Sequence, residues 1–255
     1  MNNLFTVFRY TFIEVVRSKL MVLIPIISLV ILFISYLSST FAYGAPGRVA
    51  IDIGLGLMSI SNLVVAVLVG SSLISKEIES KTIYMIISKP ISRNQFLIGK
   101  ILGLCCFLII NVIVQGIVSI LIYKFFSGSI PALLYYTCLL SLFESLILML
   151  ITIFFSLISN VSLTVIFSFL IWIVGSALAE TQKIIFLKSN QVLSVILKIG
   201  IKILPDFSKF NVKDFVLYQQ VLPDGYLSNA LLYFVLYSLA IFIAVSLIFK
   251  NKDLN

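Results

Sequence analysis

The chain has 255 residues, of which 61% are hydrophobic and only 11% charged, and its mean hydropathy is +1.18. A soluble domain averages about 25% charged residues, and a soluble fold of this size could not hide so much apolar surface. The composition excludes a soluble globular protein and indicates an integral membrane protein. The net charge of +8 is explained by basic residues that flank spans and face anionic lipid, so no nucleic-acid partner is expected.

Residues 1–19 are predicted to form an amphipathic helix in the membrane interface. Its apolar residues recur at helical spacing and are Leu4, Phe5, Phe8, Phe12, Val15 and Val16. Arg9 and Arg17 fall elsewhere around the same helix. A helix with separate apolar and basic faces lies in the plane of the interface rather than across the bilayer.

Six membrane spans are predicted from long intervals that contain at most one charge. A spanning helix needs about 20 apolar residues, and a charge at its centre costs about 2.5–3.5 kcal/mol. The intervals are Leu20–Leu37, Ile53–Ser75, Ile101–Tyr123, Leu133–Phe155, Val161–Ala179 and Gly225–Phe249. The polar break Ser156–Ser162 separates the fourth and fifth spans, and Asp52 is expected to cap the second at its outer N-terminus. The fold class is therefore an all-α integral membrane protein with a single transmembrane domain, residues 1–255.

Basic residues predict the orientation. They concentrate in the N-terminal segment, between the second and third spans and in the C-terminal tail. Because basic residues are enriched in cytoplasmic segments, both termini and residues 76–99 are expected to be cytoplasmic, in a multi-pass protein of the cell (cytoplasmic) membrane.

Residues 181–228 are then expected to form an outer connecting segment. The polar residues of an amphipathic helix within it form one stripe: Lys188, Gln191, Ser194, Lys198 and Lys202. Apolar residues cover the rest of that helix, which Pro205 ends. The sequence leaves open whether the segment lies flat on the membrane or re-enters it.

One charged segment interrupts the apolar pattern at residues 77–100, EIESKTIYMIISKPISRNQFLIGK. A first helix should stop near Ser88, because the residue before Pro90 avoids helical geometry. Ser92 and Gln95 fit an S-x-x-Q capping box, which starts a new helix. The pattern predicts a helix, a tight turn and a second helix, stiffly joined to the second and third spans.

Parts of this segment match a known pattern: Glu77-x-Glu79, Thr82, Ser88-Lys89-Pro90-Ile91-Ser92-Arg93 and Gly99-Lys100. They resemble the first cytoplasmic loop of type-2 ABC transporter permeases, the six-span membrane subunits of ATP-driven exporters. In that family the loop forms a coupling helix that docks on an ATPase. The resemblance implies that the residues that couple to the ATPase are Glu77, Glu79, Ser88, Lys89, Pro90, Ile91, Ser92 and Arg93.

The chain departs from the family pattern at Lys81, where glycine is common. With Leu204-Pro205-Asp206-Phe207, it looks most similar to the branch associated with multicopper-enzyme maturation. It has no His or Met cluster for copper, and with no histidine a His/Cys metal site is not expected.

The resemblance implies a non-catalytic transport subunit that alternates between inward-open and outward-open forms. The chain lacks the G-x-x-x-x-G-K-[ST] motif, so ATP and Mg²⁺ are expected on a separate ATPase present in two copies, and no cofactor is expected in this chain. The other expected partners are a second copy of the permease or a close relative, membrane lipid and accessory subunits.

Polar side chains inside the spans are further candidates. Glu144 lies mid-span, and an intramembrane ionisable residue is a functional candidate. Two interpretations stay open: Glu144 faces a translocation path or meets a cation there, or it is a protonated or hydrogen-bonded side chain that ties helices together. Asn111 and Gln115 share one face of the third span, and with Asn62 they are expected to form interhelical hydrogen bonds.

The alternative function is a stand-alone secondary transporter with Glu144 as its intramembrane ionisable site. Such transporters typically have matched halves or broken helices, and this sequence shows no internal repeat. A membrane-embedded enzyme would need a cluster of His, Asp or paired carboxylates, which the sequence does not contain. An adjacent reading frame with a Walker A motif would favour the permease.

Overall fold

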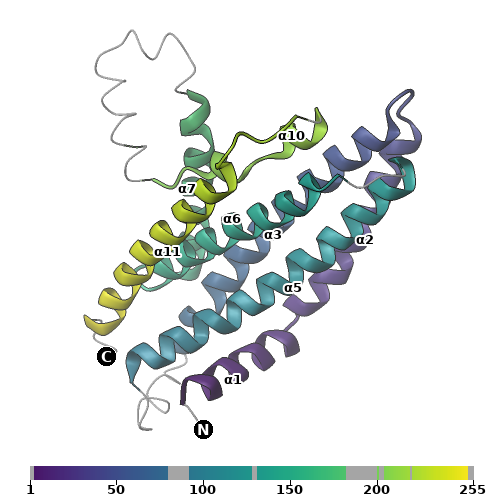
Figure 1. Ribbon diagram of the computed structural model, residues 1–255. Coiled ribbons are helices and arrows are strands. Elements are labelled where there is room, and N and C mark those ends of the chain that lie inside the picture. The colour runs from purple at the N-terminus through teal and green to yellow at the C-terminus, as the bar shows by residue number, and fades with distance from the viewer. Residues whose placement is uncertain are drawn as a thin grey trace.

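The computed structural model describes residues 3–79, 92–127, 131–181, 200, 204–218 and 220–251. Over these residues the chain forms helices joined by shorter connections (Figure 1). The helices are α1 Asn3–Arg17, α2 Leu20–Thr40, α3 Pro46–Glu79, α5 Arg93–Ser127, α6 Leu133–Ser156, α7 Val161–Thr181, the 3-10 helix η1 Phe207–Phe210, α10 Lys213–Leu217 and α11 Tyr226–Asn251. The all-α fold class is therefore confirmed for the described part of the chain.

Five described helices are long and apolar enough to cross a membrane: α2, α3 up to Ser71, α5, α6 and α11. The protein is accordingly a multi-pass helical membrane protein. Helix α7 has a shorter apolar stretch, Val161–Ala177, so a sixth span stays a prediction. The polar break between the fourth and fifth predicted spans is confirmed, because α6 ends at Ser156 and α7 begins at Val161.

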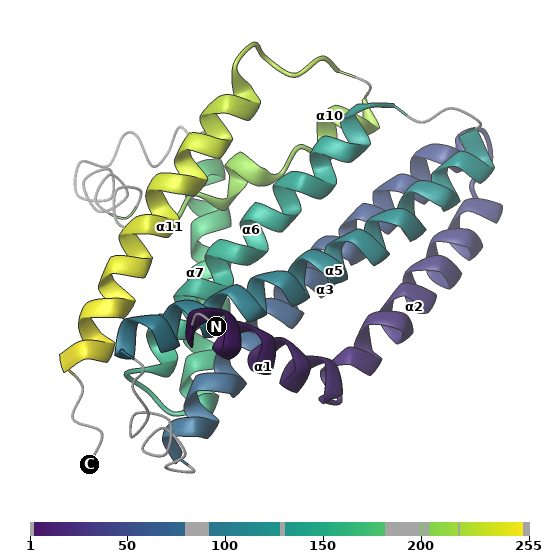
Figure 2. The same cartoon turned by 60° about the horizontal axis from the view of Figure 1, so that its bottom comes forward.

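Helix α3 lies at the centre of the bundle and packs against α2, α5, α6 and α7. Its buried side chains point in several directions and include Val65, Ala66, Val67 and Val69. In contrast, only 22% of the most apolar 18-residue stretch of α2 is buried, and only 6% of the corresponding stretch of α11. These two helices lie at opposite edges of the bundle (Figure 2), where their apolar side chains suit contact with lipid.

The two ends of the bundle are built differently. Helix α1, the start of α5 and the end of α11 lie at one end, which we call the α1 end (Figures 1 and 2). Helix α10 packs on α3 and α6 towards the other end, which we call the α10 end.

Helix α1 packs closely on α5. Val7, Thr11 and Val15, at steps of four residues, are buried. A Cβ atom added at Gly99 would lie 2.8 Å from Val7, and one added at Gly103 would lie 2.8 Å from Thr11. The two glycines lie one helical turn apart on α5 and let the helices approach closely, as small residues do in membrane bundles.

The predicted apolar face of α1 is therefore divided in two. Val15 belongs to the face that packs on α5, together with Val7 and Thr11. Phe5, Phe8 and Phe12 form a separate row in which neighbouring ring centroids are 6.0 Å and 6.4 Å apart. This row remains partly exposed, which suits the predicted position in the interface.

The connection before α11 packs into the bundle where it is described. Phe207 and Phe210 of η1 are at most 2% exposed and belong to a core with α6, α7 and α11. The Asp206 N–H donates a hydrogen bond of 2.8 Å to Tyr233 Oη on α11. Tyr226 Oη donates to the Lys209 carbonyl at 3.0 Å. The predicted stripe from Lys188 to Lys202 lies outside the described residues.

Candidate functional site

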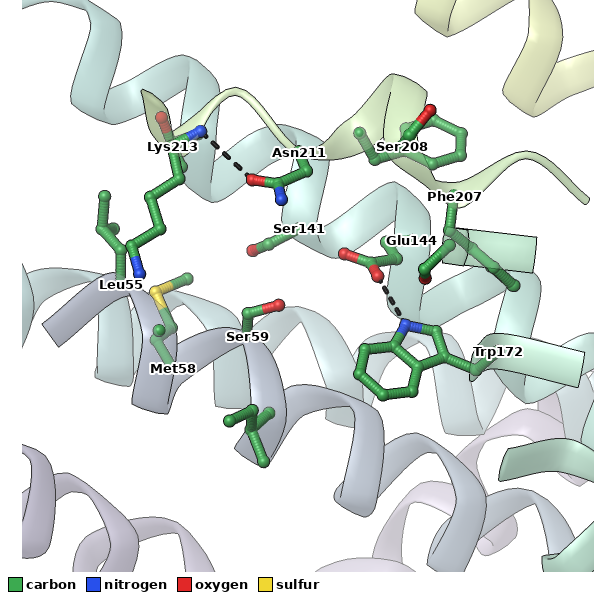
Figure 3. A pocket seen from close by; sticks show the side chains of 15 residues that line it. Leu55, Met58, Ser59, Ser141, Glu144, Trp172, Phe207, Ser208, Asn211 and Lys213 are labelled. Carbon is green, nitrogen blue, oxygen red and sulfur yellow. Dashed lines mark hydrogen bonds between the residues drawn. The ribbon is translucent and has the colours of Figure 1, made fainter. Parts of the chain in front are cut away.

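A cavity of about 310 Å³ lies between α3, α6 and α7 and is covered by η1 and α10. Its apolar lining includes Leu55, Met58 and Phe207. The polar side chains around it are Ser59, Thr137, Ser141, Glu144, Trp172, Ser176, Ser208, Asn211 and Lys213. The cavity thus joins an apolar wall to polar groups supplied by α3, α6, α7, η1 and α10, and by Asn211 between the last two (Figure 3).

Glu144 is the acidic side chain of this cavity. It is 7% exposed, and its Oε1 accepts a hydrogen bond of 2.8 Å from Trp172 Nε1 on α7. Its other oxygen points towards the space between Ser141 and Ser59 (Figure 3). Glu144 therefore ties α6 to α7, as the hydrogen-bonding interpretation expected, and it lines a cavity; a translocation path at this position stays a prediction.

The α6 hydroxyl groups of the cavity have their protons engaged. Thr137 Oγ1 donates to the Leu133 carbonyl at 3.0 Å, and Ser141 Oγ donates to the Cys138 carbonyl at 2.9 Å. A hydroxyl group that donates one hydrogen bond keeps two lone pairs. These side chains therefore present acceptors to their surroundings.

An ion pair joins the cover of the cavity to α3. Lys213 Nζ contacts Asp52 Oδ1, and Lys213 Nζ lies 3.1 Å from the position of a Cβ atom added at Gly56. The prediction that Asp52 caps a helix is wrong, because α3 begins at Pro46 and already includes Asp52. Proline fits the first turn of a helix, so the helix starts earlier than the apolar pattern indicated.

A polar network connects α3 to α5 inside the bundle. Asn111 Nδ2 donates to Asn62 Oδ1 at 2.7 Å, and Gln115 Nε2 donates to Asn111 Oδ1 at 3.1 Å. Ser61 Oγ donates to Gln115 Oε1. The predicted interhelical hydrogen bonds are confirmed, and the sequence missed Ser61 as a member. The buried Nδ2 of Asn62 has no hydrogen-bond partner.

The capping box at the start of α5 is confirmed. Gln95 N donates to Ser92 Oγ at 3.3 Å, and Ser92 N donates to Gln95 Oε1 at 3.3 Å. Arg93 Nη1 donates to the carbonyls of Phe249, at 3.5 Å, and Lys250, at 3.0 Å, near the end of α11. The last carbonyls of a helix have no partner within that helix, and an arginine nearby can donate hydrogen bonds to them. Arg93 of α5 does this for the end of α11.

The remaining predicted coupling residues are not described in detail. Glu77 and Glu79 lie in the last turns of α3, where side chains fall outside the described part. Ser88, Lys89, Pro90 and Ile91 lie outside the described residues altogether. The described candidates Ser92 and Arg93 lie at the α1 end, whereas Glu144 lies in the cavity towards the α10 end.

Sequence reasoning missed Trp172, Ser141 and Lys213 as residues of the cavity. A signal for Ser141 was available, because Thr137, Ser141 and Glu144 recur at steps of four and three and share one helix face. Among the described residues, no group of three or more His, Cys, Asp or Glu side chains could hold a metal ion. No family model matches the chain, and no curated protein sequence matches it.

Proposed function

We propose that the chain is the membrane-spanning permease subunit of an ATP-driven exporter of the type-2 ABC class. The observation that supports this most directly is the attachment of α5 at the α1 end. The segment that resembles a coupling helix leads into α5 at Ser92, and within eleven residues α5 binds α11 through Arg93 and packs on α1 through Gly99 and Gly103.

This attachment would convert a push on residues 76–91 into motion of several helices. The capping box makes the start of α5 stiff, since both of its hydrogen bonds close within one turn. Helix α5 has 35 residues, so at 1.5 Å per residue it extends about 50 Å. Its hydrogen bonds to α3 through Asn111 and Gln115 would pass the displacement to a wall of the cavity.

The proposal includes the partners and orientation that the loop implies. Two copies of an ATPase would bind ATP and Mg²⁺ and dock on the α1 end, which would be cytoplasmic together with both termini. A second permease copy or a close relative would complete the transporter in the cell membrane.

The test is co-purification followed by a coupled assay. The tagged full chain, expressed with its neighbouring genes, should retain a polypeptide that contains a Walker A motif and hydrolyses ATP. Arg93→Ala should leave that ATPase bound and active while ATP-dependent export falls about tenfold or more, because α11 loses its tie to α5. Arg48→Ala, at an exposed position near the start of α3, is the matched control and should export normally.

Two results would refute this function. The first is the absence of any bound ATPase in a complex that still transports. The second is full export by Arg93→Ala together with full export by a Pro90→Ala variant, since neither residue would then transmit motion.

A secondary transporter remains the second candidate, favoured by one observation. Glu144 is a buried carboxylate on the wall of a cavity, and such groups are typical of ion-coupled transport. Transport by reconstituted chain alone, driven by a proton or sodium gradient and abolished by Glu144→Gln, would decide for this candidate.

A further inference from the structure

We propose that the Glu144 cavity is a binding site for a protonated primary amine, whose ammonium group binds the Glu144 carboxylate. The inference goes beyond the function proposed above, because binding requires neither an ATPase nor transport. Three properties of the cavity support it: the balance of charges, the direction of its hydrogen bonds and its size.

Glu144 places the single acidic side chain of the described lining at the inner wall of the cavity. Lys213 is the basic residue of the lining, and its ammonium group is paired with Asp52. Among the described residues, no basic side chain forms an ion pair with Glu144. A buried carboxylate without a paired cation is neutralised either by a proton or by a positively charged ligand.

The lining groups of α6 and α7 closest to Glu144 have their own donors engaged. The hydroxyl protons of Thr137 and Ser141 are used on carbonyls within α6, and Trp172 N–H is used on Glu144. A ligand that supplies several N–H donors therefore fits these groups, and a primary ammonium carries three.

Size and ligand number favour a small organic cation over a divalent metal ion. A volume of about 310 Å³ is at the lower limit for ligand pockets, roughly 300–1,000 Å³, and accommodates a small organic group. Divalent metal ions prefer several carboxylate or carbonyl oxygens, whereas the described lining contributes the single carboxylate of Glu144. The indole of Trp172 beside it (Figure 3) adds an aromatic surface for the carbon chain of the amine.

The chain contains its own reporter for this site. Trp172 is the single tryptophan of the sequence, and its indole N–H binds Glu144 directly. The emission of the purified full chain in lipid nanodiscs should therefore change when a ligand binds. The probes are n-butylammonium, its neutral analogue 1-butanol, tetramethylammonium, which has no N–H donor, and sodium ions at the same ionic strength.

We expect a saturable change with n-butylammonium, at least about tenfold weaker binding of tetramethylammonium, and no saturable change with 1-butanol or sodium. Glu144→Gln keeps an acceptor for the Trp172 N–H but loses the charge, and it should weaken n-butylammonium binding about tenfold or more. Asp224→Asn, an equal change of charge at an exposed position, should bind like the unchanged chain.

A fold control accompanies the titration. Both variants should match the unchanged chain in helical content and in the midpoint of thermal unfolding without ligand. If Glu144→Gln fails this control, Ser141→Val, which removes one acceptor and leaves the carboxylate, replaces it and should weaken binding severalfold. The inference is overturned if n-butylammonium gives no saturable change, if tetramethylammonium or 1-butanol binds equally well, or if the folded variant binds unchanged.

Discussion

Replacement of Asn111 by leucine should destabilise the bundle more than the same replacement of Asn62, although the two side chains share a hydrogen bond. Asn111 is 0% exposed, donates to Asn62 at 2.7 Å and accepts from Gln115 at 3.1 Å. Leucine at this position leaves one buried acceptor and one buried donor without partners, at about 1–3 kcal/mol each. Because hydrogen bonds between membrane helices average only about 0.6 kcal/mol, we expect the lower end, a loss of about 2 kcal/mol.

Asn62→Leu should cost less than about 1 kcal/mol. It leaves Asn111 Nδ2 without its acceptor, but it also removes Asn62 Nδ2, a buried donor that has no partner. The two effects are of similar size and opposite sign. The two positions are almost equally buried, at 0% and 1% exposure, so burial alone would predict equal losses.

The measurement is the free energy of unfolding in lipid bicelles, with reversible trapping of the unfolded chain. Asn229→Leu on the exposed side of α11 is the control for an added apolar side chain and should change the free energy by less than about 0.5 kcal/mol. Equal losses for Asn62→Leu and Asn111→Leu, or a larger loss for Asn62→Leu, would show that the network is not arranged as described.

The other predictions concern close packing and the cover of the cavity. Gly103→Leu should separate α1 from α5 and make α1 sensitive to protease in nanodiscs, with a loss of about 1–3 kcal/mol, because an added Cβ would already lie 2.8 Å from Thr11. Gly175→Leu should displace the segment before η1, whose backbone an added Cβ would meet at 2.3 Å, and should shift tryptophan emission to the red as water enters. Lys213→Gln should lower the free energy of unfolding by at most about 1 kcal/mol, because its ion pair with Asp52 is partly exposed; a larger loss measured by thermal unfolding would contradict this.

Features that depend on neighbouring residues could be predicted from the sequence. The start of α5 followed from Ser92 and Gln95, because a capping box closes within one turn. The break between α6 and α7 followed from a polar interruption of two apolar runs. Hydrogen bonds for Asn111 and Gln115 followed from the cost of unpaired polar groups in lipid, and the structure supplies them.

Contacts between distant residues left no such signal. The bond from Trp172 to Glu144 and the ion pair of Lys213 with Asp52 join different helices, and the periodicity of either helix does not identify its partner. The same holds for α1, whose contact side is defined by Gly99 and Gly103 on α5. In an apolar environment a leucine facing lipid and a leucine facing a helix look alike, so hydropathy does not separate them.

Most polar contacts lie within two units of the bundle, and the ion pair of Lys213 with Asp52 and the bonds of Arg93 to α11 join the two. Helix α3 is bound to α5 by the network around Asn111, whereas η1 is held to α11 by Tyr226 and Tyr233. The cavity lies between α3 on one side and α6, α7 and η1 on the other. If the proposed function holds, a displacement that starts at the α1 end would pass to both units through Arg93, which binds α5 to α11.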